Sequence, residues 1–207
     1  GTVLLTAPTG RASRRMVEST GFSEGYTMHS VLGLTNDEES EGSAEMLDAD
    51  FIIADEFSMA DMALSFQFFN HIRQGVRLVL VGDKDQLPSV GAGNVLADVM
   101  HSGEIECVTL DRIYRQAGES LIVTNAHAVN RGEMPELNDK TRDFFYLSVS
   151  EPERIAAKTA DMVERAAGFI GVTPDRVQVL CPRKNGAAGS ININKLLQNR
   201  LNPSKGG

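Results

Sequence analysis

Two apolar runs of the sequence end in acidic side chains that could support nucleotide chemistry. Asp55 and Glu56 close the run FIIADE, and Asp83 closes the run LVLVGD. An Asp after a strand can hold Mg²⁺ through water, and a neighbouring Glu can act as a general base on an attacking water. Taken alone, the first pair could equally be two solvated acids, with Ser58 capping the next helix.

A glutamine follows the second acid in the segment DKDQLPSVGAG. Because the carboxyl ends of parallel strands meet at one edge of a sheet, Asp55, Glu56, Asp83 and Gln86 are expected to share one crevice. Gln86 could hydrogen-bond a terminal phosphate or orient water there, as glutamines do in nucleotide hydrolases. By itself it could also be a turn residue in a loop rich in Gly and Pro.

A third motif, APTGRAS at residues 7–13, follows the first apolar run. It lacks the spacing and the Lys of a nucleotide phosphate loop. Its backbone N–H groups, with Thr9 and Arg11, could instead contact a nucleic-acid phosphate, although an ordinary strand-to-helix turn would look the same. The segment YTMHS adds Thr27 and His29, and a lone His is more often structural than a ligand.

Arg115, in the segment LDRIYRQ, is the fourth candidate. An Arg that reaches across from a second lobe can stabilise the charge on a transferring phosphoryl group. Taken alone, Arg115 could also be a surface residue of a polar loop.

Alternating short apolar runs and helical segments must position these side chains. Strands are expected at residues 2–6, 51–54, 77–81, 107–110, 144–147 and 177–181. Helices are expected at residues 11–19, 27–32, 64–72, 95–100, 119–130, 152–170 and 190–200. This alternation predicts an α/β fold, with a parallel sheet covered by helices. We expect one domain over residues 1–106 and a second over 107–207.

Composition is that of a globular chain, with 207 residues of which 42% are hydrophobic. The net charge of −8 argues against a nucleic-acid partner, but residues 36–50 hold seven acids and no base. A nearly neutral body can still carry a local basic groove. Residues 35–49 are predicted to be a flexible insertion. Cys107 and Cys181 are expected to be buried free thiols. Because the sequence has no apolar stretch long enough to span a bilayer, we expect a cytoplasmic protein without a membrane partner.

Taken together, the motifs resemble those of the RecD/TraA-like branch of superfamily 1 DNA helicases, the exodeoxyribonuclease V alpha-subunit family, and its short RecD-like form in particular. APTGRAS resembles motif Ia, FIIADEFSM resembles motif II, and LVLVGDKDQLPSVGAG resembles motif III. LDRIYRQ followed by NAHAVNRG resembles motif IV and the start of the second RecA-like lobe. The resemblance runs nearly end to end and implies a RecA-like fold.

The resemblance also implies a role for each site residue, with ATP and Mg²⁺ as cofactors and single-stranded or junction DNA as partner. Asp55 would bind the metal and Glu56 would activate water. Gln86 would sense the γ-phosphate, and Arg115 would be the arginine that reaches from the second lobe to stabilise the transferred phosphoryl group. Asp83 would line the nucleotide site. The residues expected to face the DNA strand are Pro8, Thr9, Arg11, Thr27, His29, Pro88, Ser89 and Val90.

The chain departs from the family pattern in one important respect. The family's phosphate loop with its Lys, and its later motifs, do not occur in the 207 residues. We therefore expect a fragment of a longer 5′→3′ translocase that by itself hydrolyses ATP negligibly. The alternative is a clamp for nucleic acid or protein that kept the fold without catalysis. The segment 35–49 is acidic where relatives carry a strand-separating pin, so that function is not predicted for it.

Overall fold

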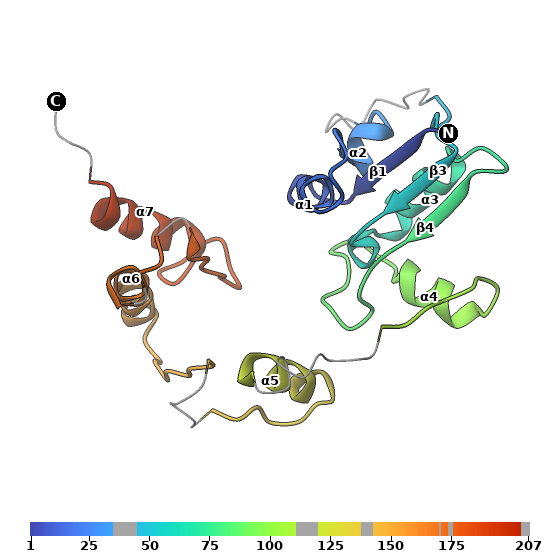
Figure 1. The fold of residues 1–207 in the computed structure, drawn as a ribbon. Coiled ribbons are helices and arrows are strands. Elements are labelled where there is room, and N and C mark those ends of the chain that lie inside the picture. The colour runs from blue at the N-terminus through green and yellow to red at the C-terminus, as the bar shows by residue number, and fades with distance from the viewer. Residues whose placement is uncertain (35–44, 111–119, 138–142, 170, 174–175, 204–207) are drawn as a thin grey trace. The chain divides into compact units, whose positions relative to one another are not determined.

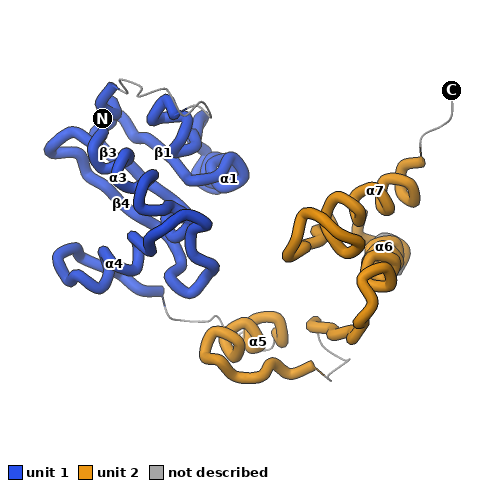
Figure 2. Tube along the Cα trace, turned by 180° about the vertical axis from the view of Figure 1, so that it is seen from behind, with its two compact units in different colours: residues 1–112 blue, residues 113–207 orange. Residues whose placement is uncertain are grey.

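The computed structural model of the chain describes residues 1–34, 45–110, 120–137, 143–169, 171–173 and 176–203. The chain divides into two compact units, Gly1–Arg112 and Ile113–Gly207 (Figure 2). The predicted domain bounds of 1–106 and 107–207 remain predictions. Among the described residues, no helix is both long and apolar enough to cross a membrane.

A four-stranded parallel sheet forms the centre of the first unit (Figure 1). Its strands stand in the order β2-β1-β3-β4. Their bounds are Val3–Ala7 for β1, Tyr26–Thr27 for β2, Phe51–Ala54 for β3 and Arg77–Leu80 for β4. Residues in register form rows across the sheet, for example Leu4, Ile52 and Leu78. The predicted parallel α/β fold is confirmed.

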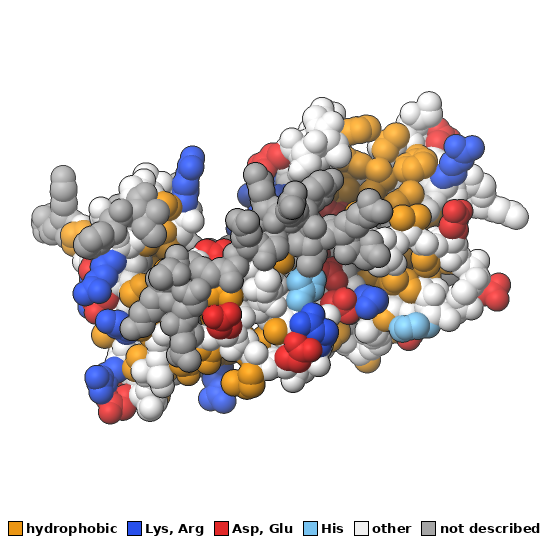
Figure 3. All heavy atoms as spheres, turned by 60° about the horizontal axis from the view of Figure 1, so that its bottom comes forward, with side chains coloured by type: hydrophobic (Ala, Val, Ile, Leu, Met, Phe, Trp, Pro, Cys, Tyr) orange, Lys and Arg blue, Asp and Glu red, His pale blue; other side chains and the backbone are white. Residues whose placement is uncertain are grey.

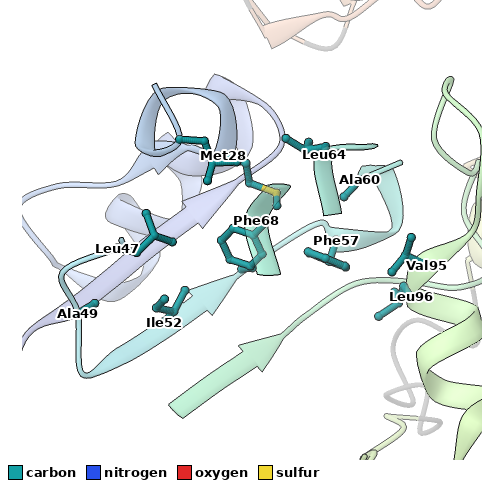
Figure 4. Close-up of a cluster of buried hydrophobic side chains, with 12 residues drawn as sticks. Met28, Leu47, Ala49, Ile52, Phe57, Ala60, Leu64, Phe68, Val95 and Leu96 are labelled. Atoms are coloured by element: carbon teal, nitrogen blue, oxygen red, sulfur yellow. The ribbon is translucent and has the colours of Figure 1, made fainter. Parts of the chain in front are cut away.

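Helices cover both faces of this sheet because side chains alternate along each strand. The row of Leu4, Ile52 and Leu78 packs into a core with α2 (Met28–Val31), the 3₁₀ turn η1 (Phe57–Met59), α3 (Met62–Asn70) and α4 (Val95–Ser102). Figure 4 shows Phe57 and Phe68 at the middle of this core. On the opposite face, α1 (Gly10–Thr20) packs through Ala12 and Met16.

Helices make up the regular structure of the second unit in its described residues. They are α5 (Leu121–Asn130), α6 (Pro152–Phe169) and α7 (Ser190–Leu201). α6 and α7 pack against each other, and Ala160 of α6 and Ile193 of α7 are buried. Arg200 strengthens this packing by donating to a carboxylate oxygen of Asp161 at 2.7 Å.

Three of the predicted strands are wrong. Residues 107–110, 144–147 and 177–181 have no strand structure, and their apolar side chains include Leu110 at 94% exposure and Leu180 at 82%. A strand needs a neighbour for its backbone groups, and no strand pairs with these segments among the described residues. For the same reason Cys107 is exposed rather than buried, although both thiols are free as predicted.

Candidate nucleotide crevice and DNA groove

The predicted acids leave two neighbouring strands at the same edge of the sheet. Backbone hydrogen bonds hold the two exits together, because Val81 N–H donates to the carbonyl of Ala54 at 2.8 Å and Phe57 N–H donates to that of Val81 at 2.9 Å. Asp55, which follows β3, and Asp83, which follows β4, therefore begin adjacent loops. We call this edge, with Asp55, Glu56, Asp83 and Gln86, the crevice after its predicted role, although none of the four residues lines either hollow described below.

Gly82 is the reason that the two loops can lie so close. A Cβ built on Gly82 would stand 3.0 Å from the backbone nitrogen of Ser58 and 2.7 Å from Cδ2 of Leu96. Any side chain at this position would push the loop that carries Asp83 away from the loop that carries Glu56. The glycine before the acid thus contributes to the geometry of the crevice.

Asp83 and Gln86 form one hydrogen-bonded turn. Asp83 Oδ2 accepts from Nε2 of Gln86 at 3.3 Å, and Oδ1 accepts from the backbone N–H of Asp85 at 3.0 Å. The Gln86 backbone N–H also donates to the Asp83 carbonyl. Gln86 is thus an exposed turn residue whose amide contacts Asp83, and its predicted contact with phosphate or water stays a prediction.

The cation nearest in sequence to Asp83 is already engaged. Lys84 Nζ donates to Oδ1 of Asp85 at 2.8 Å. This hydrogen bond, together with the negative charges of Asp85 and Asp83, raises the pKa of the Lys84 ammonium. Lys84 therefore stays protonated and offsets part of the acidity of the loop.

Glu56 has an unusual backbone. Its φ of 53° and ψ of 34° lie in the left-handed region, and it is the one non-glycine residue with positive φ in the described part of the chain. Such a conformation costs a non-glycine residue roughly 1–2 kcal/mol, and strained residues gather at functional sites. Ser58 does not cap α3: its hydroxyl is buried without a partner among the described residues, and the cap is Asp61.

The carboxylates of the crevice suit a hydrated Mg²⁺ better than an ion that is coordinated by protein side chains alone. Asp55 is half-buried, and its Oδ1 accepts the Glu56 N–H at 2.9 Å. The described residues contain no cluster of three or more metal-ligating side chains. Mg²⁺ usually keeps several waters and binds one or two carboxylates together with substrate phosphates, so Asp55 fits that role. Arg115 lies outside the described residues.

Six of the eight predicted DNA-contacting residues line one open groove of about 500 Å³. They come from three separate segments: Pro8 and Thr9 follow β1, His29 is in α2, and residues 88–90 follow β4. We call this hollow the DNA groove. Its complete lining is Pro8, Thr9, His29, Leu34, Met59, Asp61, Ala63, Leu64, Phe66, Gln67, Pro88, Ser89, Val90 and Gly91.

The two remaining predicted residues, Arg11 and Thr27, lie outside this lining. Thr27 caps α2 by accepting the backbone N–H of Ser30 at 3.1 Å, and Thr9 caps α1 by accepting that of Ala12 at 3.2 Å. The ordinary strand-to-helix turn offered for APTGRAS therefore describes Thr9, which also lines the groove. Arg11 is exposed in the first turn of α1.

The sequence prediction missed a basic face on α1. Arg14 and Arg15 stand three and four positions after Arg11, all three are exposed, and no ion pair of theirs occurs among the described residues. Ala12 and Met16 fill the opposite, buried face of the helix. The i, i+3, i+4 spacing of the arginines was the available signal.

The prediction also missed the part of the groove that η1 and α3 supply, which includes Met59, Phe66 and Gln67. In the sequence, Met59 and Phe66 look like residues of an apolar, packed side. Only the packing shows that α3 buries Leu64, Ser65 and Phe68 instead.

The loop after the crevice is attached to the start of α3. The backbone N–H of Met62 donates to the carbonyl of Ala92 at 2.9 Å, and Ser89 Oγ donates to the carbonyls of Gly91 and Gly93 at 2.9 and 3.1 Å. One short segment, residues 82–93, thus begins at the crevice and ends in the DNA groove.

These features agree with the comparison of the chain with protein families. The AAA domain family matches residues 1–146. The chain belongs to this family. The resemblance to RecD-like helicases is confirmed too, since the chain is 36% identical over 203 residues to the ATP-dependent RecD2 DNA helicase of Deinococcus radiodurans, covering 98% of this chain and 27% of that protein.

Another relative is the RecBCD enzyme subunit RecD of Mycolicibacterium smegmatis, 29% identical over 235 residues, covering 99% of this chain and 42% of the relative. The chain therefore spans less than half the length of either curated relative. Among solved structures, a Bacteroides Pif1 helicase in complex with ADP-AlF3 and single-stranded DNA has a TM-score of 0.56 at 18% identity, covering all of this chain and 48% of that one. This likeness supports the RecA-like fold of the AAA family member described here.

Proposed function

We propose that this chain is part of the motor of an ATP-dependent helicase that moves 5′→3′ along single-stranded DNA. One observation carries the proposal: the segment 82–93 holds Asp83 and Gln86 at the crevice and Pro88, Ser89 and Val90 in the DNA groove. Because the segment is short, a nucleotide bound at the crevice would change the position of the residues in the DNA groove. The RecD-like relatives are named as ATP-dependent DNA helicase and RecBCD subunit, in agreement with this proposal.

Each residue of the crevice has a proposed task in hydrolysis. ATP with Mg²⁺, when bound, would supply the anhydride bond and the charge that polarises it. Asp55 would hold the hydrated ion, and Glu56 would accept the proton of the attacking water. Gln86, oriented by Asp83, would position that water or contact the terminal phosphate. Arg115 is proposed as the residue that neutralises charge on the transferred group.

The first test is DNA binding by the 207-residue chain. Fluorescence anisotropy with a labelled single strand should show weak binding that falls steeply with salt, because phosphate contacts release counterions. A duplex of the same length should bind less well, since its bases are not free to enter the groove. Tight, salt-insensitive binding, or a preference for the duplex, would contradict the proposal.

The second test is ATP hydrolysis. The sequence contains no G-x-x-x-x-G-K-[ST] loop, so phosphate release by the 207-residue chain should be negligible. In a longer protein that adds such a loop, DNA-stimulated release should appear, and Glu56→Gln should abolish it while leaving DNA binding unchanged. Release by the short chain that Glu56→Ala removes would show that this assignment of the phosphate site is wrong.

A further inference from the structure

Phe66 is a large apolar side chain that the fold leaves uncovered. It stands in the middle of α3 with 62% of its surface exposed. The neighbouring phenylalanines Phe57, Phe68 and Phe69 pack against one another, with ring centroids 5.8 to 6.0 Å apart. Phe66 takes no part in these ring contacts.

Its ring borders two adjacent hollows. One is the DNA groove, and the other is a smaller hollow of about 360 Å³ lined by Asp61, Met62, Ala63, Phe66 and Ala92. The two hollows share Asp61, Ala63 and Phe66. A flat group entering from either side would therefore meet the aromatic ring. Figure 3 shows that apolar side chains also reach the surface elsewhere, so exposure alone would not single out this residue.

The charges of the groove decide which part of a nucleic acid would face Phe66. No Lys or Arg is found among the described residues that line the groove. The lining contributes one carboxylate, Asp61, whose Oδ1 accepts the backbone N–H of Leu64 at 2.8 Å. Phosphates would be repelled by this carboxylate and would find no cation to pair with. The side of the strand that faces inward must then be the bases.

We propose that Phe66 is a stacking platform for an unpaired base of single-stranded DNA. This inference rests on the proposed function and adds to it the orientation of the strand, with bases toward α3. Stacking suits a translocating protein because every base offers a π-face, so it does not depend on sequence. Gln67, the next residue of the lining, could donate to a base edge.

The proposal is tested by exchanging the ring and removing the bases. In anisotropy titrations with the 207-residue chain, Phe66→Ala should weaken binding of single-stranded DNA by about 5-fold to 150-fold, the range for loss of one base–aromatic stack. Phe66→Trp should restore it. The matched control is Phe22→Ala, which removes another exposed phenylalanine of the same unit that lies outside the groove lining, and which should leave the affinity unchanged.

An oligonucleotide of abasic linkers separates stacking from every other role. Phe66→Ala should bind this backbone as well as the wild-type chain does. Equal losses on normal and abasic strands, or no loss on either, would overturn the stacking role while the DNA groove stands. A lowered melting temperature with unchanged DNA affinity would show that Phe66 packs against protein. A wild-type chain that fails to bind single strands at low salt would overturn the proposed function itself.

Discussion

Gly91 determines how closely the 88–93 loop can approach α3. A Cβ at this position would stand 1.9 Å from Oδ2 of Asp61, the residue that caps the helix. Gly91→Ala should therefore displace either the loop or the cap, and should lower the free energy of unfolding by about 1–2 kcal/mol. Urea denaturation followed by circular dichroism measures the change.

Gly10→Ala is the control for this prediction. A Cβ on Gly10 would meet only Cγ2 of Thr27 at an ordinary 3.8 Å, in the first turn of α1 where alanine is favourable. The control should be neutral or slightly stabilising. Equal stability of both variants would show that the contact between Gly91 and Asp61 does not constrain the loop.

Asp143 links the stability of the second unit to pH. Its Oδ1 accepts the backbone N–H of Leu121 at 2.7 Å, and Ser120 Oγ donates to its Oδ2. The Ser120 hydrogen bond, followed by those from the backbone, holds the Asp143 pKa below its ordinary value of 3.8. The stabilisation is therefore complete above that value and is lost as pH falls through the lowered pKa.

The expected result is an acid-dependent loosening of α5. Amide exchange in Leu121–Asn130 should accelerate below pH 3.8 in the wild-type chain. Asp143→Asn cannot titrate, so it should remove this pH dependence. It should also weaken the hydrogen bonds at the start of α5 and speed amide exchange there at neutral pH. Glu136→Gln is a control, since that residue contacts Asn125 through its backbone. An unchanged acid profile in Asp143→Asn would refute the capping role.

At the scale of the element, α1 carries a face of three exposed arginines that could contact a DNA backbone. If Arg14 and Arg15 each neutralise one phosphate, removing both should reduce the slope of log affinity against log salt by about 1.4, which is about 0.7 per contact for single strands. Titrations of Arg14→Ala/Arg15→Ala at several salt concentrations measure this slope. Arg73→Ala, whose guanidinium is paired with Asp48, should leave it unchanged.

Sequence reasoning located most elements of the first unit because each carries its own signal. The run FIIA forms β3 and the run RLVL forms β4, as predicted. Helix starts were less certain: α3 begins at Met62 rather than 64, because Asp61 and not a later residue supplies its cap. Six of the residues predicted to contact DNA line one groove, since spacing after a strand is a local property. Their chemical roles stay predictions.

The groove wall formed by α3 could not be predicted in the same way. Phe66 and Phe68 are the same residue type two positions apart, yet one is 62% exposed and the other is fully buried. What separates them is which face of α3 packs into the core: Phe68 lies in the buried cluster and Phe66 lines the groove. Periodicity identifies two faces of a helix, and it does not show which face meets solvent when both are apolar.

At the scale of the whole molecule, the two units differ in how their secondary structure is supported. In the first unit the strands predicted at residues 2–6, 51–54 and 77–81 found partners in register, whereas the one predicted at 107–110 did not. Segments of the same composition at 144–147 and 177–181 did not, and they remain irregular. A strand depends on residues that lie far away in sequence, whereas a helix satisfies its own backbone. That difference explains why the errors gather in strands and why α5, α6 and α7 were found.

The position of β4 has a practical consequence for anyone who purifies this chain. In the described residues β4 pairs on one side only, with β3, and Val79 and Val81 are 40% and 44% exposed. Unpaired strand edges with apolar side chains are templates for association between molecules. Light scattering should reveal clustering that grows with protein concentration, and Val79→Lys should suppress it without changing the circular dichroism spectrum. Storage in dilute solution would then preserve the monomer for DNA titrations.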